Sequence, residues 1–144
     1  MTEIKKTALI SFTDQQMFNL VKDVDKYQEF LPWCSDSRLT FSKGNRFCGA
    51  ITVERMGVNQ SFSTCNTCDE PSKIAISLDD GPFETLQGYW QFDALDEKAC
   101  KISLKLEFEF SSKLMEVAFG AVFNHIANTM VESFCKRAKE VYGV

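Results

Sequence analysis

Hydrophobic and polar residues alternate most regularly along residues 99–110 of the chain. Every second position there is apolar, namely Ile102, Leu104, Leu106, Phe108 and Phe110, and most positions between them are charged. Because the side chains of a strand point to opposite faces in turn, this pattern predicts a β-strand with one buried face. That face requires an apolar layer packed against it.

Shorter patterns of the same kind, separated by turn residues, predict six further strands. Their expected ranges are 3–11, 38–42, 47–56, 60–69, 74–78 and 85–94. After the first strand we expect a helix that is capped by Thr13 or Asp14 and ends near Asp25. Residues 27–34 are predicted to form a short helical turn followed by an exit into a strand, because Pro32 prevents a longer helix.

Residues 113–141 are predicted to form one long helix. Its apolar residues recur at spacings of three and four and are Met115, Phe119, Val122, Phe123, Ile126, Ala127, Met130, Val131 and Phe134. A transmembrane helix is the alternative, but Asn124, His125, Asn128 and Glu132 interrupt the apolar stretch at a high cost of insertion. We therefore expect an amphipathic helix that is buried against the sheet.

The predicted order of elements is a strand, two helices, six strands and a long helix, which is an α+β arrangement. Short turns between consecutive strands imply an antiparallel sheet. The C-terminal helix is the only element long enough to cover its apolar face, so we expect a curved sheet wrapped around this helix. Such a fold can enclose an apolar cavity between sheet and helix. No linker or repeat interrupts the sequence, and residues 1–144 are predicted to form a single domain.

The composition adds an unusual number of aromatic rings, with 13 Phe, 3 Tyr and 2 Trp among 144 residues. Some of these rings are expected to line a cavity, because sites for large apolar ligands have aromatic and aliphatic walls. Ordinary core packing is the alternative for each ring. The net charge of −4, concentrated in an acidic stretch over residues 61–98, argues against a general polyanion binder and against direct DNA binding.

The cysteines and the histidine suggest no catalytic centre. No signal-peptide pattern opens the chain, so we expect a cytoplasmic protein whose six cysteines are free thiols. The single Cys-x-x-Cys motif, Cys65 to Cys68, lacks the further ligands that a zinc site requires. His125 is expected at the edge or surface of the long helix rather than as a general base. Nucleotide-binding and hydrolase motifs are absent, so a binding protein is expected rather than an enzyme.

Three segments match patterns of one known family. Residues 27–34 are Tyr-Gln-Glu-Phe-Leu-Pro-Trp-Cys, and residues 81–92 are Gly-Pro-Phe-Glu-Thr-Leu-Gln-Gly-Tyr-Trp-Gln-Phe. They resemble the Y-x-x-F-L-P-W-C and G-P-F-x-x-L-x-G-x-W-x-F patterns of the coenzyme Q-binding (Coq10-like) family, and residues 119–143 are similar to its closing helix. The bacterial branch of this family includes ribosome association toxins of the RatA type. The absence of a transit-like N-terminus favours that branch.

The resemblance implies the START-like helix-grip fold of the polyketide cyclase/dehydrase superfamily, and two alternative functions. The first is a non-catalytic carrier that holds ubiquinone or menaquinone by its isoprenoid tail, supports respiration and makes transient contact with the inner membrane. The second is a toxin that binds the large ribosomal subunit, blocks its joining to the small subunit and inhibits translation initiation. Neither function implies a metal or a required cofactor.

The resemblance also places ligand contacts on this chain in three groups. The mouth or lid of the cavity would comprise Phe30, Leu31, Pro32 and Trp33. The sheet side would comprise Phe83, Leu86 and Trp90, and the helix side Phe119, Phe123, Ile126 and Met130. A bound quinone ring would need one or two hydrogen-bond donors, which the sequence does not identify. Ordinary core packing is again the alternative for each residue.

Overall fold

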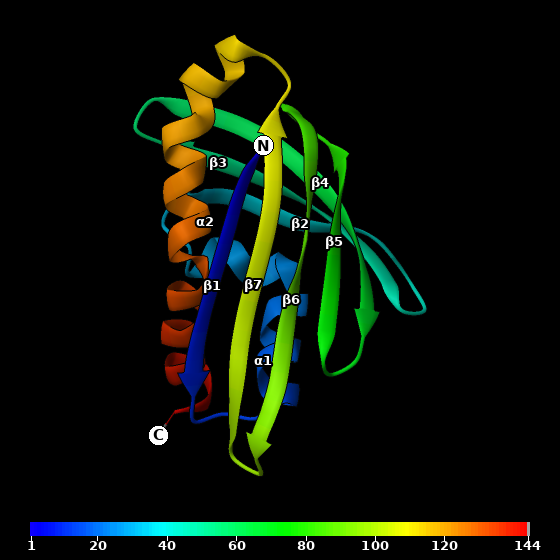
Figure 1. The fold of residues 1–144 in the computed structure, drawn as a ribbon. Coiled ribbons are helices and arrows are strands. Elements are labelled where there is room, and N and C mark those ends of the chain that lie inside the picture. Colours follow the sequence, from blue (N-terminus) through cyan, green and yellow to red (C-terminus); the bar gives the residue numbers. More distant parts are fainter. Residues whose placement is uncertain (144) are drawn as a thin grey trace.

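A computed structural model describes residues 1–143 and contains one antiparallel sheet of seven strands in the order β1-β7-β6-β5-β4-β3-β2. The strands are β1 (Thr2–Ile10), β2 (Cys34–Lys43), β3 (Arg46–Arg55), β4 (Val58–Asp69), β5 (Lys73–Asp80), β6 (Phe83–Asp96) and β7 (Ala99–Phe110). All seven predicted strands are therefore present, and most extend one to four residues beyond the predicted ranges. In Figure 1 the sheet is strongly curved, and β2 and β3 cross behind the upright strands β1, β7 and β6.

Three helical segments complete the fold: α1 (Asp14–Lys22), the 3-10 helix η1 (Val24–Glu29) and α2 (Lys113–Tyr142). Thr13 is the N-cap of α1, because its hydroxyl accepts a hydrogen bond from the Gln16 amide while the Gln16 side chain accepts one from the Thr13 amide. The short helical turn begins at Val24, earlier than the predicted segment, and the exit into a strand lies within that segment. The turn ends at Glu29, so the chain is already entering β2 at Cys34.

One face of β7 is buried and the other is exposed, as the alternation of apolar and charged residues predicts. Ile102, Leu104 and Phe108 are almost completely buried, whereas Lys101 and Glu109 on the other face are exposed. Strand β6 pairs with β7 so that Trp90 lies opposite Leu104. This register places the apolar residues of both strands on one face of the sheet, which is the face that the helices cover.

Helix α2 packs its apolar stripe against this concave face, as Figure 1 shows for its course beside β1 and β7. Its buried residues are Phe119, Gly120, Phe123, Ile126, Ala127, Val131, Phe134 and Ala138. His125 is exposed, as predicted. Within residues 1–143, no helix combines the length and the apolar composition needed to span a membrane. The predicted α+β fold, a curved antiparallel sheet around a long C-terminal helix, is confirmed.

The expectation of six free thiols is wrong for one pair. Cys48 on β3 and Cys65 on β4 form a disulfide, and the other four cysteines are free. The two residues lie directly opposite each other in the antiparallel ladder, with their Cα atoms 4.1 Å apart. At such close pairs the side chains project to the same face of the sheet and meet. The prediction was drawn from the cellular compartment and did not consider strand register.

Candidate functional site

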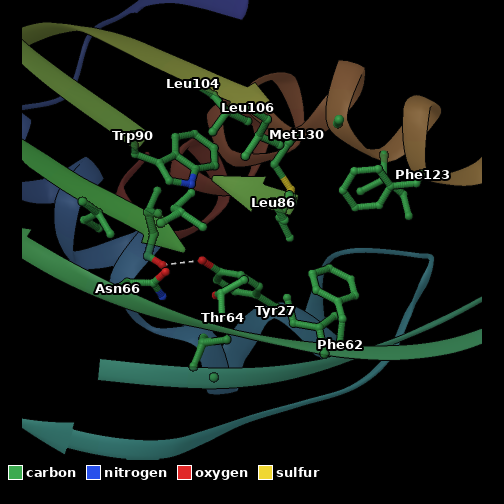
Figure 2. Close-up of a pocket in the computed structure, with 18 of the residues that line it drawn as sticks. Tyr27, Phe62, Thr64, Asn66, Leu86, Trp90, Leu104, Leu106, Phe123 and Met130 are labelled. Carbon is green, nitrogen blue, oxygen red and sulfur yellow. Dashed lines mark hydrogen bonds between the residues drawn. The ribbon is translucent and has the colours of Figure 1, made fainter. Parts of the chain in front are cut away.

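A cavity of about 90 Å³ lies between the concave face of the sheet, α2 and the α1–η1 segment. Its lining residues are Val21, Val24, Tyr27, Phe47, Gly49, Ile51, Phe62, Thr64, Asn66, Ile74, Ile76, Leu86, Trp90, Leu104, Leu106, Phe123, Ile126, Ala127 and Met130. The walls are therefore aliphatic and aromatic with few polar atoms. Figure 2 shows side chains from the strands and from α2 directed into this space. A wall of this kind suits an apolar ligand.

One end of the cavity is closed by aromatic rings. Phe62 from β4 and Phe123 from α2 lie edge to face with their ring centroids 5.9 Å apart. Behind them, Phe83 and Phe108 lie 4.9 Å and 4.8 Å from the Phe123 ring. Figure 2 shows Phe62 and Phe123 together at one side of the pocket. These contacts join the sheet to α2 and determine how far the cavity extends in this direction.

The opposite end carries most of the polar groups that face the cavity. Tyr27 from η1 is buried, and its hydroxyl donates a hydrogen bond to the Val21 carbonyl. Burial raises the pKa of Tyr27 well above its ordinary value, so this phenol stays protonated and neutral. Figure 2 draws Asn66 from β4 at the same side of the pocket as Tyr27, and the indole of Trp90 from β6 across from them. The cavity thus has an aromatic end and a more polar end.

Five of the residues expected at the ligand lie on the cavity wall: Leu86, Trp90, Phe123, Ile126 and Met130. Two others, Phe83 and Phe119, are buried just behind the wall, where Phe119 packs 5.5 Å from Phe123. The structure thus brings the sheet-side and helix-side groups together. That these residues contact a ligand remains a prediction.

The structure places the expected mouth segment away from the cavity wall. Leu31 and Trp33 are buried in the core, and Pro32 is exposed. The Phe30 ring packs 5.1 Å from Phe134 on α2 and 5.0 Å from the Arg137 guanidinium. The Phe30 ring also lies 6.2 Å from the ring of Tyr27, which lines the cavity. A role of this segment as the mouth or lid remains a prediction.

Sequence reasoning missed the wall contributed by β3 and β4. Phe62, Thr64 and Asn66 occupy alternate positions of β4 and all face the cavity. Their two-residue spacing was a usable signal, because alternate residues of a strand share a face. The spacing alone does not tell which face is inside, since the face that carries Phe62 also carries the polar residues Gln60, Thr64 and Asn66.

Comparison with known proteins identifies related chains. The family model described as polyketide cyclase / dehydrase and lipid transport matches residues 10–135. The chain is 48% identical over 143 residues to the ribosome association toxin RatA of Vibrio cholerae, covering 99% of both chains. It is 44% identical over 142 residues to the persistence and stress-resistance toxin PasT of Escherichia coli, covering 99% of this chain and 90% of PasT.

The chain is also similar to more distant proteins, one by sequence and two by fold. It is 24% identical to the mitochondrial coenzyme Q-binding protein coq10 of Schizosaccharomyces pombe, covering 94% of this chain and 85% of that protein. Its fold matches a START superfamily protein from Mycobacterium smegmatis with a TM-score of 0.76 at 15% identity, covering 96% and 98% of the two chains. It also matches the Zhui aromatase/cyclase of Streptomyces with a TM-score of 0.79 at 14% identity, covering 96% and 93%. The fold is therefore START-like.

Proposed function

Because this chain belongs to the polyketide cyclase / dehydrase and lipid transport family, we propose that it holds a hydrophobic ligand, an isoprenoid quinone, in the cavity beneath α2. The observation that carries the proposal is the cavity itself, with its almost wholly apolar wall. Burial of apolar ligand surface is favourable by about 25 cal/mol per Å², so such a wall binds an isoprenoid tail without polar contacts. We assign no catalytic step to the site.

The size of the cavity limits which part of a quinone it holds. A volume of about 90 Å³ is several times the roughly 10–15 Å³ that a cavity needs to hold one water molecule. Sites for drug-sized ligands measure about 300–1,000 Å³. We therefore propose that the cavity accepts the ring or the first part of the tail, and that a longer tail requires Phe62 and Phe123 to move apart.

The two tryptophans provide a test of ligand binding. Trp90 lines the cavity, whereas Trp33 is buried elsewhere in the core. Quinones quench tryptophan fluorescence on contact, so titration with a short-tailed ubiquinone analogue is expected to quench Trp90. The Trp33→Phe variant, which keeps Trp90 as its reporter, should be quenched with saturation. The matched Trp90→Phe variant should respond weakly, and equal quenching of both would contradict binding in this cavity.

A second role, association with the ribosome, is favoured by the relatives. The Vibrio cholerae protein named ribosome association toxin is 48% identical over nearly the whole chain. We propose that this protein likewise binds the large ribosomal subunit in the bacterial cytoplasm, blocks subunit joining and inhibits translation initiation. Quinone exchange would take place at the inner membrane surface, by transient contact.

The net charge of the protein predicts how binding to the ribosome would depend on salt concentration. With a net charge of −4, the chain lacks the broad basic surface of a general RNA-binding protein. Lys136 and Lys139 lie near the C-terminal end of α2, where positive charge favours the helix dipole. We therefore expect contact mainly with ribosomal proteins. Sedimentation with separated subunits should show binding to the large subunit that changes little between 50 and about 200 mM salt, whereas absence from both subunits would exclude the role.

A further inference from the structure

We infer that Asn66, together with the indole N–H of Trp90, recognises an oxygen atom at one end of the bound hydrophobic ligand. The inference rests on the proposed ligand-binding function and adds to it the chemical class of the ligand. That class is an apolar molecule with a carbonyl or hydroxyl group at one end, such as a quinone or its reduced quinol. Asn66 is not among the ligand contacts that the sequence predicts.

Asn66 is a buried polar side chain without a protein partner for its oxygen. The residue is 8% exposed, it lines the cavity, and no described residue donates a hydrogen bond to its Oδ1. Its backbone belongs to the ladders that pair β4 with β3 and β5, opposite Phe47 and Ile76. The strand is thus held by its neighbours, and the amide group is left to face the cavity.

The unpaired amide oxygen of Asn66 lowers the stability of the fold, and no hydrogen bond from the described residues offsets this loss. Leaving a buried polar group unpaired costs about 1–3 kcal/mol. A leucine would fill the same position on the wall beside Ile74 and Ile76 without that cost. The amide carries both a donor and an acceptor whichever way its two ends are assigned. A ligand oxygen would accept from the amide nitrogen, and a ligand hydroxyl would donate to the amide oxygen.

Further polar groups lie at the same end of the cavity. The indole nitrogen of Trp90 is directed toward the side of the pocket on which Asn66 and Tyr27 lie (Figure 2). An indole N–H can only donate, which suits a carbonyl oxygen. Thr64 precedes Asn66 by two positions and lines the same wall. The hydrogen of the Tyr27 hydroxyl is already used by the Val21 carbonyl, so this phenol offers only an acceptor.

The rest of the cavity wall favours an apolar group at the other end of the ligand. From Asn66 toward Phe62 and Phe123 the cavity is bounded by aliphatic and aromatic side chains, including Leu86 and Met130. A ligand with polar atoms at both ends would leave one end without hydrogen bonds in this region. The cavity therefore favours a molecule with one oxygen-bearing end and an apolar remainder.

Two probes of nearly equal shape test the inference: 2-methyl-1,4-naphthoquinone and 2-methylnaphthalene, which differ by two carbonyl groups. Binding of each is measured by equilibrium dialysis with the wild type and with Asn66→Leu. We expect this variant to lower the affinity ratio of quinone to hydrocarbon about tenfold, and to bind the hydrocarbon at least as well. Comparing ratios between variants cancels the different water solubilities of the probes.

Thr85→Val is the matched control, because the Thr85 hydroxyl is also buried and unpartnered but does not line the cavity. It should leave the affinity ratio unchanged. An unchanged ratio in Asn66→Leu, with both probes still bound, would overturn the role of Asn66 while leaving the ligand-binding function intact. If the folded wild type binds neither probe, the ligand-binding function itself fails. Urea unfolding confirms that each variant is folded, and Asn66→Leu should be at least as stable as the wild type.

Discussion

Phe62 on β4 and Phe123 on α2 meet edge to face at one end of the cavity, with ring centroids 5.9 Å apart. One ring belongs to the sheet and the other to the helix, so their contact depends on how closely α2 lies against the sheet. Phe123 is almost completely buried and lines the cavity. A substitution at Phe123 therefore changes both the cavity wall and the contact of α2 with the sheet.

Phe123→Asp is expected to abolish retention of a hydrophobic ligand. The carboxylate would either be buried at high cost or draw water into the cavity, and both outcomes remove the apolar surface that binds the ligand. Quenching of Trp90 by the short-tailed quinone measures the effect. Val117→Asp is the control, because Val117 is exposed on the same helix and should bind as the wild type does. Undiminished saturable quenching in folded Phe123→Asp would refute the assignment.

Arg137 is expected to hold η1 against α2. Its guanidinium lies 3.0 Å from the Glu29 carboxylate and 5.0 Å from the centre of the Phe30 ring. An exposed ion pair contributes about 0.2–1 kcal/mol and a cation–π contact about 0.5–1 kcal/mol. Arg137→Ala should therefore lower the free energy of unfolding by about 1–2 kcal/mol in urea titrations. The adjacent exposed residue provides the control Lys136→Ala, and equal stability of the two variants would show that the contact contributes nothing.

Gly88 on β6 has no room for a side chain. A Cβ atom at this position would lie 1.9 Å from the Lys105 carbonyl oxygen, which is backbone and cannot move aside. Gly88→Ala should therefore destabilise the protein by about 1–3 kcal/mol or more, measured as a lower unfolding midpoint.

Gly120→Ala is expected to have the opposite effect and to raise the unfolding midpoint. A Cβ at this position of α2 would lie 3.7 Å from the Phe110 ring of β7, an ordinary contact, and alanine in a helix gains about 0.5–1 kcal/mol over glycine.

Stability is expected to fall in mildly alkaline solution. Burial raises the pKa of Cys34 and of Cys100 from the ordinary 9.0 to about 11. Above pH 9 the unfolded chain releases these protons while the folded chain retains them. The free energy of unfolding therefore decreases as the pH rises from 9 toward 11, and the contribution is complete only below pH 9.

Urea midpoints measured between pH 8 and pH 10.5 test this dependence. Cys100→Ala should lose stability less steeply over the same range, whatever its stability at pH 8. The slope is the informative quantity, because removing a buried side chain also lowers stability at every pH. Identical slopes for the variant and the wild type would show that the Cys100 thiol does not contribute.

Patterns that are local in the sequence predicted much of the fold. The alternation of Leu104 and Lys105 along β7 depends only on strand geometry, and the apolar spacing of α2 only on helix geometry. The cap at Thr13 is likewise a contact within four residues. The family resemblance, not the spacing, placed Phe119, Phe123, Ile126 and Met130 at a ligand, and all of these except Phe119 line the cavity.

Features that depend on contacts between distant parts of the chain, such as strand register, could not be predicted from the sequence. The facing of Cys48 and Cys65 is decided by how β3 pairs with β4, across a separation of 17 residues. The position of Asn66 on the cavity wall depends on the same pairing. Phe30 was expected at the mouth of the cavity, yet the contact that holds it is made with Arg137 at the far end of the chain. Such contacts become visible only when the sheet is assembled.

Organic extraction of the protein purified from its own host, followed by mass spectrometry, measures whether the cavity is occupied. We expect about one equivalent of an apolar molecule that carries an oxygen-bearing ring or end group, with an isoprenoid quinone as the expected compound. The extract of Phe123→Asp should lack it. A folded wild-type protein that yields no such molecule would show that the cavity does not hold a hydrophobic ligand.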